Sequence, residues 1–310
     1  MDTIVCTEKV TRTFKKTIAL HDLDLSIAHG ELFGLVGPDG AGKTTALRLM
    51  AAVMRPTSGH VRVAGFDTAR ESESIRAHVG YMPQRFSLYA DLNVLENLNF
   101  FADIFGVSGA DRQRRIVQLL EFANLARFVD RRAGQLSGGM QKKLALACTL
   151  IHAPAVLLLD EPTTGVDPVS RREFWDILTE LHIAGTTIVV STPYMDEAER
   201  CNRIGLLSRG QLIQCGTPSE IKAMVQGQVI ELRPDPMFRA QELLAGRPDV
   251  MEVQVYGDLL HVFVDDARQR MPELKVVLEQ GGVTINGIRA IQPRMEEAFI
   301  SIVRKHGVER

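Results

Sequence analysis

A glycine-rich stretch near the amino terminus constrains this chain more than any other feature. The segment GPDGAGKT, from Gly37 to Thr44, fits the spacing G-x-x-x-x-G-K-[ST]. It follows the short apolar run LFGLVG and precedes the run KTTALRLMAAVM, which reads as a helix. Glycines let consecutive backbone N–H groups curl around phosphate oxygens, and the following helix presents its positive end. The sequence therefore predicts a strand, a phosphate-binding loop and a helix in that order.

This loop supplies most of the predicted contacts to a nucleotide. We expect Lys43 to reach the β- and γ-phosphates, and the Thr44 hydroxyl to be placed for Mg²⁺. A glycine turn without a ligand is the alternative, and the flanking strand and helix argue against it. The predicted nucleotide-binding residues of the loop are Gly37, Pro38, Asp39, Gly40, Ala41, Gly42, Lys43, Thr44 and Thr45.

A pair of carboxylates ends a second apolar run, VLLLDEP. Ends of neighbouring parallel strands meet in one crevice, so Asp160 and Glu161 are expected beside the loop. Asp160 would then orient Mg²⁺, and Glu161 would polarise an attacking water as general base. Asp-Glu-Pro is also good chemistry for a turn that starts a helix, which is the alternative interpretation.

The order of apolar runs predicts two domains. Near-continuous apolar strands alternate with helices, which indicates an α/β fold with a mainly parallel sheet covered on both faces. Apolar residues at helical spacing predict a helical subdomain at about 91–152, inserted between two halves of that core. From residue 226 onward, the pattern strand-helix-strand-strand-helix-strand predicts a small split βαβ appendage. We therefore expect domains at 1–225 and 226–310, the second structural or regulatory.

Composition excludes several classes of protein. A net charge of −2 over 310 residues does not provide the strongly basic face that nucleic-acid binding requires. The four cysteines are scattered without a C-x-x-C pair, which favours a reducing cytosol. No signal peptide and no apolar run approaching membrane length is readable.

A second helix start bears exposed glycines, in the segment LSGGMQKKL at Leu136 to Leu144. One nucleotide cannot rest on two distant helix ends of one domain when each needs the γ-phosphate. Two copies that face each other remove this difficulty. The loop of one copy would hold the triphosphate while Ser137, Gly138 and Gly139 of the other cap it, so that cleavage releases the pair.

The ordered set of motifs resembles the ATP-binding cassette (ABC) ATPase subunits of membrane transporters over about residues 3–220. The set is the phosphate loop, YMPQ, LSGGM, LLLDEP and GVDP. The segments RFSLYADLNVLENLNFFADIFG and STPYMDEAE look most like drug and antibiotic exporters. The resemblance implies a P-loop NTPase fold with a RecA-like core sheet, an antiparallel β subdomain and a helical subdomain.

The resemblance also implies cofactors and partners. These are ATP with Mg²⁺, transmembrane permease subunits, and a second ABC cassette as a homodimer or heterodimer. It places the chain peripherally at the cytoplasmic face of the inner membrane, where it would power multidrug efflux.

Single positions take family roles from the resemblance. Gln84 would sense Mg²⁺ and the γ-phosphate, joining Thr44 and Asp160 around the metal. Asp167 would cross between the two cassettes. Phe14 would stack on adenine, with a core strand phenylalanine as the alternative. The apolar group Phe86, Leu88, Tyr89 and Leu92 would receive a permease helix, with ordinary packing as the alternative.

Two positions depart from the family pattern. Met140 replaces a glutamine in the signature, which we expect to matter little because backbone donors do most of the work there. Pro193 replaces a histidine that touches the γ-phosphate, and proline has neither a side-chain donor nor an N–H. We therefore expect slow turnover, or reliance on another group such as the Thr192 hydroxyl. A slow or non-hydrolytic regulatory cassette in a heterodimer, and a non-transport ABC ATPase, remain the alternatives.

Overall fold

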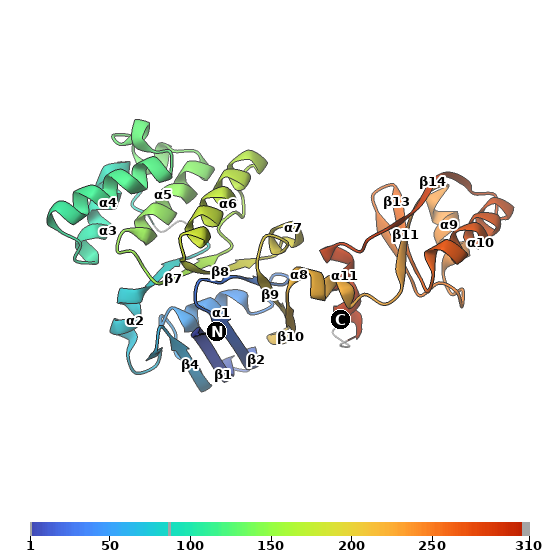
Figure 1. Cartoon of the computed structure of the whole chain (residues 1–310), viewed down its shortest axis with the longest axis horizontal. Helices are drawn as coiled ribbons and strands as arrows, with labels where there is room; N and C mark the ends of the chain where they lie inside the picture. Colours follow the sequence, from blue (N-terminus) through green and yellow to red (C-terminus); the bar gives the residue numbers. More distant parts are fainter. Residues whose placement is uncertain (1, 86–87, 306–310) are drawn as a thin grey trace. The chain divides into compact units, whose positions relative to one another are not determined.

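The computed structural model describes residues 2–85 and 88–305. It divides the chain into two compact units, Met1–Thr217 and Pro218–Arg310, each with its own sheet (Figure 1). Within the described residues, no helix is both long and apolar enough to cross a bilayer.

The first unit is built on a six-stranded sheet in the order β10-β9-β3-β8-β7-β6. The five strands from β9 to β6 pair in parallel, and β10 joins the edge in antiparallel fashion. Every residue of β3, β7 and β8 is buried, so this sheet is covered on both faces as predicted. Its strands are β3 (Leu32–Val36), β6 (Val79–Met82), β7 (Val156–Asp160), β8 (Thr187–Thr192), β9 (Arg203–Ser208) and β10 (Gln211–Gly216).

A second, antiparallel sheet of the first unit has the order β2-β1-β4-β5. Its alternating apolar residues, such as Leu23 and Ile27, share one hydrophobic cluster with Phe33 and Leu35 of β3. The two sheets therefore enclose a common core. Its strands are β1 (Thr3–Phe14), β2 (Thr17–Ala28), β4 (Ser58–Val63) and β5 (Phe66–Asp67).

Three helices form the predicted helical subdomain, drawn in green in Figure 1. The first begins at the predicted capping box, because Asn93 and Glu96 exchange side-chain-to-backbone hydrogen bonds of 2.7 and 2.8 Å. The subdomain helices are α3 (Val94–Ile104), α4 (Gly109–Phe122) and α5 (Gly138–Leu150), with 3₁₀ turns at Ala126–Phe128 and Ala133–Gln135. The other helices of the first unit are α1 (Lys43–Met50), α2 (Ser72–His78), α6 (Pro168–Ile183) and α7 (Met195–Ala198).

The second unit is an antiparallel sheet in the order β12-β13-β11-β14, with the element order predicted from the sequence. The structure divides the chain after Thr217, whereas the sequence analysis placed the boundary after residue 225. Helix α8 belongs to the second unit because it contacts α11, a pairing across about eighty residues that no local pattern reveals. The elements are α8 (Pro218–Ala223), β11 (Gln228–Asp235), α9 (Met237–Leu244), β12 (Glu252–Tyr256), β13 (Leu259–Val264), α10 (Ala267–Gln280), β14 (Thr284–Ile291) and α11 (Met295–Lys305).

Candidate nucleotide site

The phosphate loop lies between the end of β3 and the start of α1. Gly40 and Gly42 have φ values of 78° and 106°, a left-handed backbone that favours glycine. A Cβ on Gly37 would lie 2.1 Å from the backbone oxygen of Leu207, so close packing also requires glycine there. The loop opens into a pocket of about 180 Å³ lined by Lys43, Thr44 and Glu161, among others. The spacing of the motif is thus realised as a cradle at the N-terminus of a helix.

Lys43 closes over this cradle. Its Nζ donates to the carbonyl oxygens of Gly37 at 2.8 Å and Pro38 at 3.0 Å, and pairs with Glu161 Oε1 at 3.0 Å. The side chain is only 3% exposed, so the ammonium is held inside the loop where phosphates would bind.

Asp160, the last residue of β7, is fully buried beside the loop. Its Oδ1 accepts hydrogen bonds from the hydroxyls of Thr44 at 3.0 Å and Ser191 at 2.8 Å. Its Oδ2 is buried and has no hydrogen-bond partner among residues 2–85 and 88–305. An unpaired buried carboxylate oxygen next to a hydroxyl fits a Mg²⁺ ion, which binds one or two protein oxygens and completes its shell with water and phosphate.

Glu161 occupies a strained position at the centre of the site. Its φ of 46° is left-handed, which is uncommon for a residue with a side chain. The backbone N–H donates to Ser191 Oγ at 3.0 Å, and Oε2 accepts from Gln84 Nε2 at 2.7 Å. Glu161 therefore contacts both Gln84 and Lys43, and these three residues were predicted separately from three motifs.

The residues predicted to act across a pair of cassettes lie at the starts of helices α5 and α6. Ser137 is the N-cap of α5 and accepts from Met140 N–H at 3.3 Å, so the Met140 substitution leaves this backbone donor intact. Asp167 is the N-cap of α6 and accepts from Val169 and Ser170 N–H, and these bonds lower the pKa of its exposed carboxyl. In the described part of the chain, no hydrogen bond joins Ser137 or Asp167 to the cradle.

Gly138 and Gly139 have different surroundings. A Cβ on Gly139 would lie 2.4 Å from Ser170 Oγ and 2.5 Å from Ser170 Cβ, whereas a Cβ on Gly138 would meet nothing closer than 3.9 Å. Gly139 therefore lets α5 and α6 pack closely, and Gly138 leaves the helix end open.

Replacing Gly139 with alanine is expected to lower the free energy of unfolding by about 1–3 kcal/mol, because the backbone of α5 or α6 must shift. Gly138→Ala is the matched control and should change stability by less than about 0.5 kcal/mol. Urea unfolding of both variants measures this difference. Equal stability of the two would contradict the packing role of Gly139.

The hydroxyl of Thr192, the last residue of β8, is not free to contact a phosphate. Thr192 is fully buried, donates to Glu197 Oε2 at 2.5 Å and accepts from Tyr194 N–H at 3.1 Å. Glu197 also accepts from Thr163 and Arg171, each at 2.6 Å. The expectation that Thr192 could stand in for a donor at position 193 is therefore wrong.

The predicted adenine and permease contacts are partly exposed. Phe14 is 41% exposed at the end of β1, with the Arg12 guanidinium 4.6 Å from its ring centroid, so it is not a core residue. Tyr89 is 50% exposed and Leu88 is 9% exposed, which divides the predicted apolar group. The other two members of the group are Leu92 and Phe86, and Phe86 lies outside the described residues.

Comparisons with known proteins decide the family. The sequence profile of the ABC transporter family matches residues 20–164. The Nod factor export ATP-binding protein I of Paraburkholderia xenovorans is 40% identical over 271 residues, which cover 86% of this chain and 88% of that protein. This chain belongs to the ABC transporter ATP-binding family.

Other members of the family are similarly close. The daunorubicin resistance ATP-binding protein DrrA2 of Streptomyces coeruleorubidus is 34% identical, over 95% of this chain and 93% of that protein. The probable multidrug ABC transporter ATP-binding protein YbhF of Escherichia coli is 42% identical over 92% of this ABC chain, which spans 49% of YbhF. The chain thus spans about half the length of that relative.

Solved ABC cassettes share the fold. The dimeric post-hydrolysis structure of the cassette MJ0796 bound to ADP and Pi has a TM-score of 0.64 at 30% identity, covering 69% of this chain and 98% of that one. CbiO1 from Clostridium perfringens has a TM-score of 0.66 at 27% identity, covering 72% of this chain and 92% of that one. The predicted membership of the ABC ATP-binding family and the predicted P-loop fold are confirmed.

Three residues of the ABC site escaped the sequence analysis. Ser191 Oγ donates to Asp160 Oδ1 and accepts from the backbone N–H of Glu161. Lys142 Nζ donates to Gln84 O at 3.0 Å, and Glu197 joins the segments that hold Thr163 and Thr192. Burial lowers the pKa of Lys142, against the opposite influence of Asp160 and Glu161. Ser191 and Glu197 lie in the quoted segment STPYMDEAE, but only tertiary packing shows what they touch.

Proposed function

We propose that this ABC cassette binds Mg-ATP, hydrolyses it, and thereby drives efflux of drug-like or hydrophobic compounds through separate transmembrane permease subunits. The observation that carries the proposal is the convergence of Lys43, Thr44, Asp160, Glu161 and Gln84 on one cradle. The names of the relatives, which include multidrug, daunorubicin resistance and Nod factor export proteins, support the transport role.

The chemistry follows from an exchange of partners at Lys43. In the structure its ammonium is paired with Glu161 and with two carbonyl oxygens of the loop. Phosphate oxygens in the cradle compete for the same ammonium, so binding of ATP frees the Glu161 carboxylate. That carboxylate can then hold the attacking water and accept its proton, while Gln84 keeps it oriented through Oε2. Thr44 and Asp160 would hold a Mg²⁺ ion, which would supply positive charge next to the β- and γ-phosphates.

The catalytic unit would be a pair of cassettes. Ser137 and Asp167 cap helices whose starts are exposed, and within residues 2–85 and 88–305 neither makes a hydrogen bond to the cradle of its own chain. A second cassette, identical or different, would bring its signature residues Ser137, Gly138 and Gly139 to that nucleotide. In this proposal the pair works peripherally at the cytoplasmic face of the inner membrane, and the half-exposed Tyr89 contacts a permease helix.

The nucleotide site is tested by replacing the buried lysine. Lys43→Met is expected to weaken ATP binding about tenfold or more, because charge-assisted hydrogen bonds to two phosphates are lost. Isothermal titration with Mg-ATP measures the affinity. Lys275→Met removes an exposed lysine of α10 and serves as the control. Unchanged affinity in Lys43→Met would show that the nucleotide binds elsewhere.

A further inference from the structure

A second pocket of the first unit lies away from the phosphate loop. It has a volume of about 560 Å³ and is formed by α4, the C-terminal ends of α5 and α6, and the turns that precede β3, β7 and β8. We call it the α4–α6 pocket. Its volume falls within the range of about 300–1,000 Å³ that small-molecule sites occupy.

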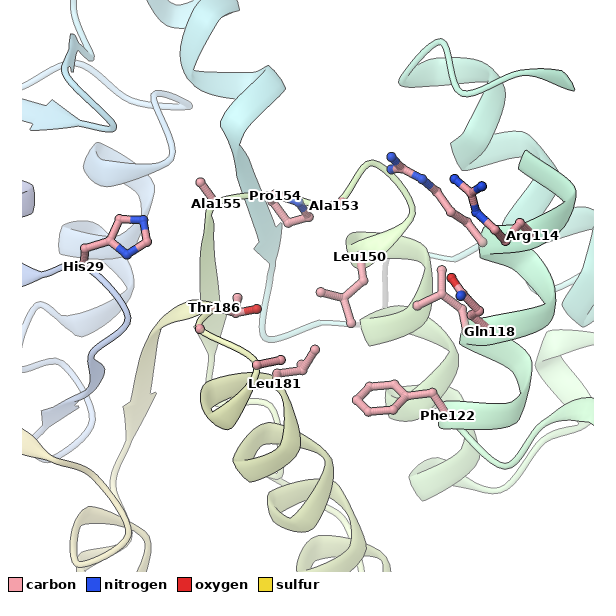
Figure 2. Close-up of a pocket in the computed structure, with 14 residues that line it drawn as sticks. His29, Arg114, Gln118, Phe122, Leu150, Ala153, Pro154, Ala155, Leu181 and Thr186 are labelled. Atoms are coloured by element: carbon pink, nitrogen blue, oxygen red, sulfur yellow. The ribbon is translucent and has the colours of Figure 1, made fainter. Parts of the chain in front are cut away.

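The lining of the α4–α6 pocket combines an apolar floor with positive charge. Leu119, Phe122, Leu150 and Leu181 supply the apolar surface, and Figure 2 shows Phe122, Leu150 and Leu181 facing the same space. His29, Arg114 and Arg115 also line it, and among the described residues that line the pocket none is acidic. A ligand that matches both features has an apolar body and an anionic group.

The two arginines can receive such a group. Arg115 Nη1 donates to the carbonyl of Ile151 at 3.0 Å, which fixes the guanidinium while its other N–H groups remain as donors. Arg114 pairs with Asp111 on the exposed surface of α4, so only part of its charge is offset. A planar guanidinium matches the geometry of a carboxylate or a sulfonate.

Several segments that line the pocket, though not α4, continue into elements whose other ends carry predicted ATP contacts. Leu150 ends α5, whose N-cap is Ser137, and Ala184 is the C-cap of α6, whose N-cap is Asp167. Ala155 precedes β7, which ends at Asp160. A ligand in the pocket therefore contacts one end of rigid elements whose other ends carry the predicted ATP contacts.

We propose that the α4–α6 pocket binds a small soluble amphipathic anion, with an apolar body and one carboxylate or sulfonate, and that its occupancy changes the affinity of the cassette for ATP. The inference goes beyond the transport role proposed above and assigns a regulatory ligand class to a surface outside the nucleotide site. Coupling between the two sites must be reciprocal, so each ligand changes the affinity of the other by the same factor.

Binding is tested on the full chain with the fluorescent anion 1-anilinonaphthalene-8-sulfonate (ANS). Ala184→Phe places a ring in the pocket from an exposed helix end and is expected to weaken ANS binding about tenfold or more. Arg114→Gln should weaken it about threefold or more through the lost charge. The matched controls are Ile183→Phe and Arg127→Gln, which change exposed residues outside the pocket and should stay within about twofold.

Several results would overturn the proposal. The first is that the parent does not bind ANS. The second is that the parent and Ala184→Phe bind ANS equally. The third is that ATP displaces ANS while Ala184→Phe has no effect on ANS binding, and this result would place the probe in the phosphate loop. A protein mass that doubles without ANS and returns to that of one chain in Ala184→Phe would show that a second copy fills the pocket.

The regulatory part is tested by titrating ATP with and without saturating ANS. The ATP affinity of the parent should change about fivefold or more, as typical coupling energies imply, and that of Ala184→Phe should not change. Unchanged affinity in the parent would overturn this part. Titration of Ala184→Phe with ATP alone is the control for the nucleotide site, because that variant should bind ATP as the parent does. Normal ATP binding there shows that an absence of coupling is not a failure of the nucleotide site.

Discussion

Replacing Glu161 with glutamine is expected to lower kcat for ATP hydrolysis by about 10²–10⁴-fold, because the amide cannot accept a proton from the attacking water. The affinity for ATP should be preserved or increased. Glu161 Oε1 lies 3.0 Å from Lys43 Nζ, and a neutral amide competes less strongly with phosphate for that ammonium. Steady-state phosphate release and isothermal titration with Mg-ATP measure the two quantities.

The control for this prediction is Glu180→Gln. Glu180 is an exposed residue of α6, so its loss should leave kcat within about twofold of the parent. If Glu161→Gln hydrolyses ATP at the rate of the parent, another group is the base and the proposed exchange of partners at Lys43 is wrong.

Replacing Pro193 with histidine is expected to raise kcat by about 10²-fold. Removal of one preorganised donor to developing phosphate charge typically costs about 10²–10³ in rate, and proline supplies no such donor. The neighbouring Thr192 hydroxyl does not compensate, because it donates to Glu197 at 2.5 Å and is fully buried. The same steady-state assay measures the change.

Two comparisons sharpen the Pro193 prediction. Pro193→Ala restores the N–H without a ring donor and should raise kcat far less than the histidine variant. The double variant Pro193→His, Glu161→Gln should lose the gain, because the base is absent. Equal kcat in the parent and Pro193→His would show that position 193 does not limit turnover.

The central parts of the site were predictable because the chemistry lies within short segments. Spacing alone placed Lys43 and Thr44 on a loop before a helix, and the apolar run before Asp160 predicted a strand end beside that loop. The structure shows Thr44 and Asp160 joined by a hydrogen bond of 3.0 Å. Parallel pairing of β3 and β7 with the intervening β8 accounts for this meeting.

Other features depend on contacts between distant segments and could not be predicted. Ser191 binds Asp160 because β8 lies between β3 and β7, and this strand order is not encoded in any single motif. The bond from Lys142 to the carbonyl of Gln84 spans fifty-eight residues. For Thr192 the sequence suggested a contact that the structure does not leave open. Its position next to Pro193 suggested a free hydroxyl, but that hydroxyl donates to Glu197.

The clasp of each nucleotide between two cassettes is tested most directly by the mass of Glu161→Gln in solution. Light scattering should report a single chain of 34.4 kDa without nucleotide or with Mg-ADP. With Mg-ATP it should report twice that mass for the chain alone, or the summed mass of the two chains when a different partner cassette is present. A chain that remains single in Mg-ATP, both alone and with every candidate partner, would contradict the account.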